Sequence, residues 1–111
     1  MTEDIKDTLK QRGSRYGAFK DNARISQSLQ AGWEESEGYI LLQSAPLEIK
    51  DTVNEGLKAI FQKLARIFNG DPLYADNFRD IGGYSMLVTE ELVKHEEGKS
   101  LMQMKQHLAE G

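Results

Sequence analysis

The fold is decided by the stretch KLARIFNGDPLYADNFRDIGGY, residues 63 to 84. Asn69-Gly70 followed by Asp71-Pro72 is typical of a tight corner, in which a left-handed glycine ends one helix and a proline starts the next segment. On both sides of this corner, apolar residues recur at the spacing of a helix. Two long helices joined by so short a connection predict an antiparallel hairpin.

The first helix of the hairpin is expected from about residue 46 to 69, with Ser44 as its N-cap and Pro46 near its first turn. Its apolar residues fall on one arc at helical spacing: Val53, Leu57, Ile60, Phe61, Leu64, Ile67 and Phe68. The second helix is expected from about 74 to 95. Gly82-Gly83 inside it costs about 1 kcal/mol per glycine relative to alanine, which indicates that another backbone or a ligand comes close there.

The rest of the chain predicts shorter helices. We expect them at residues 2–11 and 19–29, with RGSRYG (12–17) as a break between them. Residues 32–44 are expected to form a loop around a short apolar piece. HEEGK is expected to end the long helix, which leaves residues 97–111 as a further helix that docks either onto the domain itself or, at an oligomer interface, onto a second subunit. The prediction is one all-α domain of 111 residues, a small helical bundle.

Size and composition bound the function. A chain of 111 residues and 12.6 kDa has a modest core, so we expect a homo-oligomer. A net charge of -4 argues against binding to long nucleic acids, which favour basic proteins. The chain has no cysteine, which excludes disulfides and a thiol nucleophile. No apolar run is long enough to cross a bilayer, so the expected location is the cytoplasm.

Three carboxylates indicate a metal site near the corner. Asp76 and Asp80 are four residues apart and share one helix face, and Glu55 is expected to face them across the hairpin. Magnesium takes oxygen ligands and needs only a few carboxylates when substrate phosphates complete its shell. The sequence therefore predicts a magnesium site of these three residues. The structural alternative, an ion pair between Asp80 and Lys63 or Arg66, stays open.

Cations and aromatic rings indicate a phosphate or nucleotide near the same corner. Guanidinium groups can bind phosphate in bidentate fashion, and ammonium groups act as point charges. In RGSRYG, backbone N–H groups beside two glycines can approach a phosphate while Tyr16 stacks on a base. A turn whose tyrosine packs on the core is the alternative for that residue. The predicted nucleotide- and phosphate-binding residues are Arg12, Arg15, Tyr16, Lys63, Arg66 and Tyr84.

These motifs support a resemblance. The run KLARIFNGDPLYADNFRDIGGYSMLV, with the upstream RGSRYGAFKDNARI, resembles an uncharacterised family of small phage and prophage proteins over about residues 9–92, with 32–52 matching poorly. More distantly, the two-helix core is similar to the MazG-like all-α nucleotide pyrophosphohydrolases. Those enzymes use magnesium and a four-helix core to cut a nucleoside triphosphate into monophosphate and pyrophosphate. The resemblance implies a protein of the infected or lysogenic bacterial cytoplasm.

Carried over, the MazG-like pattern places Glu55 on the first metal-binding helix and Asp80 on the second, with Asp76 nearby. The pattern has Glu-x-x-Glu on one helix and Glu-x-x-Asp on the next. Here Lys58 stands three residues after Glu55, and Asn77 stands three residues before Asp80. The missing carboxylates weaken the case for catalysis more than the case for binding.

Three functions of different class follow. The first is a magnesium-dependent nucleoside triphosphate pyrophosphohydrolase, which the resemblance places slightly ahead. The second is a non-catalytic nucleotide-binding sponge that sequesters a nucleotide signal of host defence, with anti-defence as its role. The third is a helical adaptor whose acidic surface binds another protein.

Overall fold

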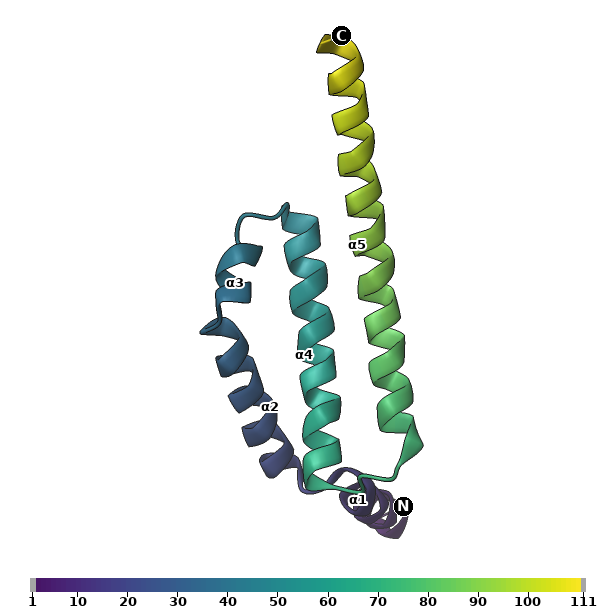
Figure 1. The fold of residues 1–111 in the computed structure, drawn as a ribbon. Helices are drawn as coiled ribbons and strands as arrows, with labels where there is room; N and C mark the ends of the chain where they lie inside the picture. Colours follow the sequence, from purple (N-terminus) through teal and green to yellow (C-terminus); the bar gives the residue numbers. More distant parts are fainter. Residues whose placement is uncertain (1, 111) are drawn as a thin grey trace.

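The computed structural model describes residues 2–110, apart from the side chains of residues 2–4, 11–14, 100 and 101. Five helices follow one another along this part of the chain (Figure 1): α1 (Thr2–Tyr16), α2 (Phe19–Glu34), α3 (Glu37–Leu42), α4 (Leu47–Asn69) and α5 (Ala75–Glu110). The described residues contain no strand. The predicted all-α fold is confirmed.

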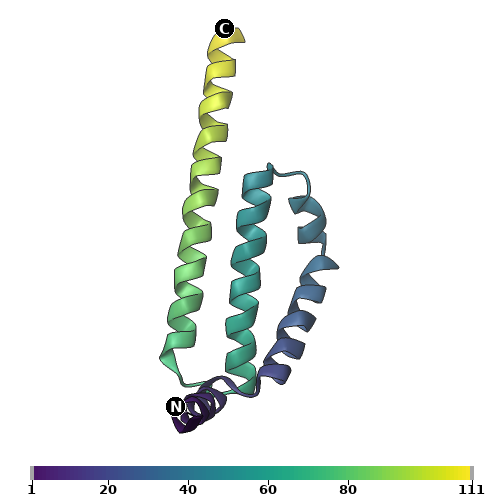
Figure 2. The same ribbon diagram turned by 180° about the vertical axis from the view of Figure 1, so that it is seen from behind.

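Helices α2, α4 and α5 lie side by side with α4 in the middle, and α1 crosses the end of this layer (Figures 1 and 2). Both views show the C-terminal part of α5 projecting past the start of α4. The molecule is therefore elongated, with extents of 72 × 26 × 26 Å.

The hairpin of α4 and α5 is also confirmed. A Cβ at the buried Gly56 would collide with Val88, which shows how closely the two helices approach. Further along, the Lys63 ammonium lies 3.0 Å from the Asp80 carboxylate. These two contacts fix the antiparallel register, and the second is the ion pair that was the structural alternative to a metal ligand.

The connection between the two helices differs from the prediction. Gly70 has φ -122 and ψ -135, so the expected left-handed C-cap is wrong. The reason is α1: Gly70 packs against the backbone of Arg15, whose carbonyl accepts a hydrogen bond of 3.0 Å from the Asp71 N–H. Asp71 Oδ1 then accepts one of 2.9 Å from the Leu73 N–H. The end of another helix thus stabilises the corner.

Helix boundaries also differ from the prediction. Helix α1 continues to Tyr16 and α5 continues through Gly98 to Glu110, because a single glycine costs a helix only about 1 kcal/mol when strong helix formers flank it. The separate helix expected at 97–111 is therefore part of α5.

The segment expected to be a loop, residues 32–44, is largely helical. Helix α2 extends to Glu34 because the Trp33 indole N–H donates to Asn54 Oδ1 at 3.0 Å, which holds the end of α2 against α4. Ser36 then caps α3, its Oγ accepting from the Tyr39 N–H at 3.2 Å. Ser44 does not cap α4, whose N-cap is Pro46 without a side-chain hydrogen bond.

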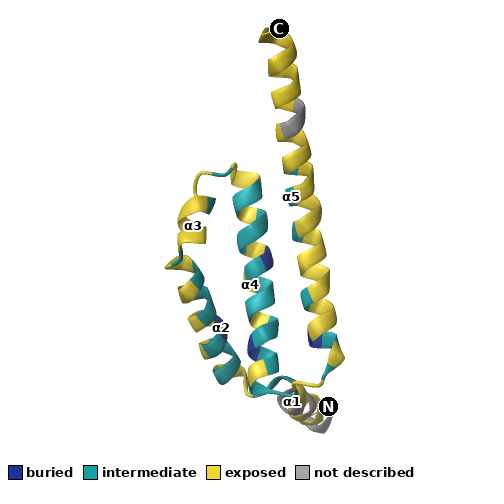
Figure 3. Ribbon diagram, in the orientation of Figure 1, coloured by how far each residue is buried: buried dark blue, intermediate teal, exposed yellow. Residues whose placement is uncertain are grey.

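The buried interior is small (Figure 3). Among the described residues the only buried large side chain is that of Asn77, and the apolar residue buried most completely is Ala65. Many large apolar side chains are exposed instead, from Phe19 on α2 to Leu108 near the end of α5. No helix in the described part of the chain is long and apolar enough to cross a membrane.

Candidate functional site

The end of α1 and the connection between α4 and α5 pack tightly together, forming what we call the corner. Gly17 has φ +80, and a Cβ there would collide with Asn69. The Asn69 side-chain N–H group donates to the Ala18 carbonyl and to Asn22 Oδ1, both at 3.3 Å. Only glycine fits at position 17. The Tyr-Gly pair of the sequence motif is therefore a structural joint between α1 and α4.

Stacked side chains cross the corner. The rings of Tyr16 and Tyr74 stack with their centroids 5.9 Å apart and their planes at 18°. The Arg66 guanidinium lies 4.6 Å from the centre of the Tyr16 ring, and that of Arg15 lies 4.7 Å from the centre of the Tyr74 ring. Arg15 also forms a 3.0 Å ion pair with Asp71. Cation–π contacts of this kind contribute about 0.5–1 kcal/mol each at exposed sites.

Tyr74 also has an acidic neighbour. The Asp76 carboxylate raises the pKa of the Tyr74 phenol above its ordinary 10.0, first by a hydrogen bond and then by its negative charge, with a smaller effect of Tyr16. The hydroxyl proton of Tyr74 is therefore shared with the Asp76 carboxylate.

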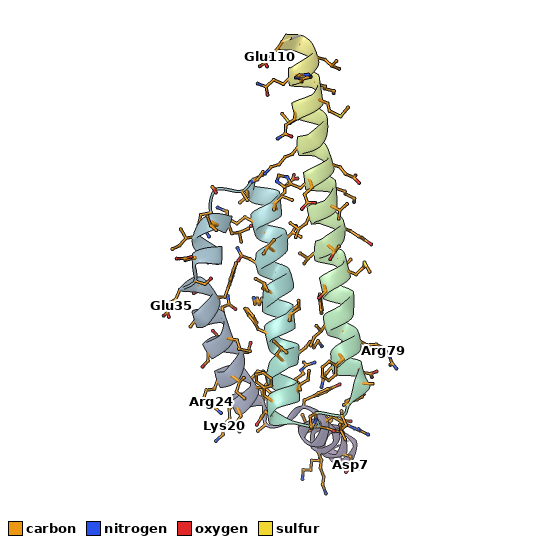
Figure 4. The ribbon with its side chains drawn as sticks, in the orientation of Figure 1. Asp7, Lys20, Arg24, Glu35, Arg79 and Glu110 are labelled. Atoms are coloured by element: carbon orange, nitrogen blue, oxygen red, sulfur yellow. The ribbon has the colours of Figure 1, made fainter. Side chains whose placement is uncertain are left out.

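A pocket of about 590 Å³ opens beside the corner, between α1, α2 and α4; we call it the α2 pocket. Tyr16 and Arg66 line its corner end, and Phe19 stands at its edge with 87% of its surface exposed. The apolar side chains of Leu9 and Ala23 line part of the rest. The polar side chains in the lining are those of Asn22, the buried Ser26, Gln27 and Gln62. Lys20 and Arg24 lie on the same helix but extend outward from it (Figure 4). The pocket thus offers hydrogen-bonding groups, aromatic rings and one cation.

Arg66 differs from the other cations near the corner. Arg15 and Lys63 each pair with a carboxylate at 3.0 Å. Within the described part of the chain, no ion pair involves Arg66. Its charge is balanced only by the face of the Tyr16 ring, and its side chain is half-buried. An anion in the α2 pocket would therefore meet an uncompensated guanidinium.

The first turn of α2 presents backbone N–H groups near the α2 pocket, although it also carries the negative side chain of Asp21. Its N-cap, Ala18, has no side chain that could accept a hydrogen bond from the first N–H groups of the helix. Ala18 and Phe19 both line the α2 pocket. Helix N-termini with free N–H groups attract anions, and here the terminus opens on the same space as Arg66.

The carboxylates predicted to bind metal do not share one place. Asp80 pairs with Lys63, and Asp76 pairs with Arg79 on its own helix at 2.6 Å. In the register set by Gly56 and Val88, Glu55 lies level with about residue 89, roughly 13 Å along α5 from Asp80 at 1.5 Å per residue.

Asn77 occupies the position where a MazG-like helix carries a carboxylate. It is 1% exposed, so a neutral amide stands in the packed side of α5. Among the described residues no group of three acidic or histidine side chains is placed to hold a metal ion. The three predicted carboxylates do not converge in this arrangement, and the magnesium site stays a prediction.

The predicted nucleotide-binding residues are divided by the fold. Tyr16 and Arg66 meet in the α2 pocket, as described above. Arg15 and Lys63 are held by carboxylates, and Tyr84 lies further along α5, which does not line the pocket. The side chain of Arg12 lies outside the described residues.

Sequence reasoning missed the α2 side of the pocket. The sequence predicts a helix at residues 19–29 but does not single out Phe19, Asn22, Ser26 or Gln27 within it. The signal was that small and polar residues replace large apolar ones on the face of α2 that meets α4, which leaves an unfilled volume. Tyr74, the stacking partner of Tyr16, was also missed.

Comparison with known proteins gives no relative: no family model, curated protein or solved structure matches the chain.

Proposed function

We propose that the chain is a nucleotide-binding protein whose ligand lies in the α2 pocket. The observation that carries the proposal is Arg66, a guanidinium without a carboxylate partner among the described residues, at the end of a pocket of about 590 Å³. Pockets for small-molecule ligands typically measure about 300–1,000 Å³. The size and the charge together suit a small anion with an organic body.

The lining groups suit the parts of a nucleotide. Arg66 and the first turn of α2 would bind phosphate oxygens, which guanidinium and backbone N–H groups recognise well. Phe19 offers a free ring face for a base, and such stacking contributes about 1–3 kcal/mol per base. The amides of Gln27 and Gln62 can donate to and accept from the base edge.

The proposal is for binding without a chemical step. The pocket lies on the α2 side of α4, whereas Asp80 and its partner Lys63 lie between α4 and α5. Binding without turnover is the property that a protein needs in order to sequester a nucleotide signal. A MazG-like hydrolase would instead need carboxylates gathered around the phosphates.

The experiment is calorimetric titration of the intact protein with linear and cyclic nucleotides, with and without magnesium. We expect one nucleotide class to bind, and Phe19→Ala to weaken its binding about tenfold or more. Leu73→Ala is the matched control, because Leu73 is 89% exposed and does not line the pocket. Since both side chains are exposed, neither change should disturb folding.

A second variant tests the phosphate contact. Arg66→Gln should weaken binding by about tenfold or more, since a hydrogen bond to a charged group contributes about 1.5–3 kcal/mol. A protein that binds none of the nucleotides refutes the proposal. Release of pyrophosphate during the titration would replace it with the hydrolase hypothesis.

A further inference from the structure

The chain exposes more surface than a compact protein of its mass. A folded monomer of 12.6 kDa exposes about 6,200 Å² by the scaling of surface with mass. This chain exposes 8567 Å², an excess of about 2,400 Å². Two such chains hold an excess of about 4,800 Å² together, which lies within the range of roughly 2,000–5,000 Å² that obligate dimers bury. The area suits one large contact with a second copy.

Much of the exposed apolar surface lies along one line of α5, which we call the α5 stripe. Its apolar members and one glycine follow helical spacing within an arc of about 120°: Phe78, Gly82, Met86, Val93, Met104 and Leu108. All six are exposed, the large ones by 44% to 76%. The same arc also holds four exposed charged residues: Arg79, Glu90, Glu96 and Glu97. The residues of α5 that are partly covered near α4, such as Ile81 and Val88, lie on the other side of the helix. Nothing in the described chain covers the stripe.

The length of α5 sets the way in which a partner can lie. The helix has 36 residues, and its C-terminal part projects beyond α4 (Figures 1 and 2). An isolated helix of this kind is marginal in water, because helical stability in proteins comes mainly from packing. An antiparallel pair centred near Val93, the middle of α5, would cover the projecting part of each helix with the first half of the other.

The side-chain sizes along the α5 stripe match this register. It brings Phe78 opposite Leu108 and Gly82 opposite Met104. A Cβ at Gly82 or at Gly83 would meet nothing within 4 Å, so the close backbone expected beside this pair does not come from the described chain itself. The space at Gly82 leaves room for a methionine from a second copy. The glycine inside a helix, which costs stability on its own, then has a packing role.

We propose that the α5 stripe is the contact with a second copy of this chain, the two α5 helices packing antiparallel with Val93 at the two-fold axis. The contact is isologous, so each stripe residue is used once by each copy. It lies on a different helix from the α2 pocket and does not depend on a ligand.

The first test is the mass in solution, measured by light scattering on the eluting full-length protein. We expect two chains for the wild type and one for Met86→Glu, because a charge in the apolar contact is left unpaired. Leu87→Glu is the matched control: Leu87 is as exposed as Met86, at 59%, but lies off the stripe, so its mass should stay at two chains. A monomeric wild type, or an assembly that Met86→Glu leaves intact, overturns the proposal.

The second test reads the orientation and uses mild variants. The natural chain has no cysteine, so single cysteines report unambiguously. Val93→Cys should form a disulfide-linked dimer in oxidising buffer, since the disulfide needs Cα atoms about 4.4–6.8 Å apart. Phe78→Cys should not link to itself, but should link to Leu108→Cys when the two proteins are mixed. Self-linked Phe78→Cys shows a parallel pair and overturns the antiparallel assignment.

Discussion

Replacing Gly17 with alanine should unfold the corner more than any surface change. The positive φ of Gly17 costs an alanine about 1–2 kcal/mol. The new methyl group also collides with Asn69, which must move and lose its hydrogen bonds to Ala18 and Asn22. These bonds contribute about 0.5–1.5 kcal/mol each, so the free energy of unfolding should fall by about 3 kcal/mol.

Urea unfolding followed by circular dichroism measures this loss. With an m-value of about 2 kcal/mol/M, the midpoint for Gly17→Ala should fall by about 1.5 M. Gly32→Ala is the matched control, because Gly32 lies inside α2 with nothing within 4 Å of the new Cβ, and it should gain about 1 kcal/mol. All samples need one protein concentration, since association shifts apparent stability. Equal midpoints for Gly17→Ala and Gly32→Ala would refute the packing described for the corner.

Three further predictions concern single side chains. Asp80→Asn should lower the free energy of unfolding by about 1 kcal/mol in chemical denaturation, because it leaves the largely buried Lys63 ammonium unpaired. Adding Lys63→Met to this variant should recover part of the lost stability. Asn77→Leu should raise the denaturation midpoint by about 0.5 M or more, because the Asn77 Nδ2 group is buried without a hydrogen-bond partner; a lower midpoint would contradict this reasoning. The Tyr74 phenol, whose pKa Asp76 raises, should ionise above pH 10.0 in an absorbance titration and at lower pH in Asp76→Asn. Since the folded state then holds this proton more tightly than the unfolded state, stability should fall as the pH rises above 10.0; equal titrations of the two proteins would exclude the effect of Asp76.

The sequence was most informative where structure depends on local pattern. The apolar periodicity of residues 46–69 and the short connection after Asn69 predicted the hairpin, because both follow from the geometry of the helix itself. The pair of Lys63 and Asp80 was foreseen as an alternative, since a hairpin brings its two helices into fixed register. Residues that pair across a hairpin lie close together in the sequence, and the position of the single turn determines which of them meet.

The corner and the pocket could not be predicted in the same way. Tyr16 stacks on a ring 58 positions later in the chain, and the Arg15 carbonyl takes the place of a helix cap. No period in the sequence encodes where α1 crosses the bundle. The α2 pocket exists because Ala23 and Ser26 are small, and periodicity records where apolar residues recur rather than where volume is missing.

The end of α5 shows a further limit. The prediction that HEEGK ends the long helix is wrong, because Glu and Lys on both sides of Gly98 favour the helix by more than one glycine costs. The part of α5 beyond Gly98 carries exposed apolar residues, which the proposed contact with a second copy would cover. A helix boundary can thus depend on a surface that only a partner would cover.

The middle position of α4 has a consequence for the response to ligand. One side of α4 forms the wall of the α2 pocket, and the other side carries α5, whose far face would hold the second copy. The proposed ligand and the proposed second copy would therefore contact different helices, with α4 between them. Two pockets in one assembly should fill independently, giving a hyperbolic saturation curve with a Hill coefficient of about one.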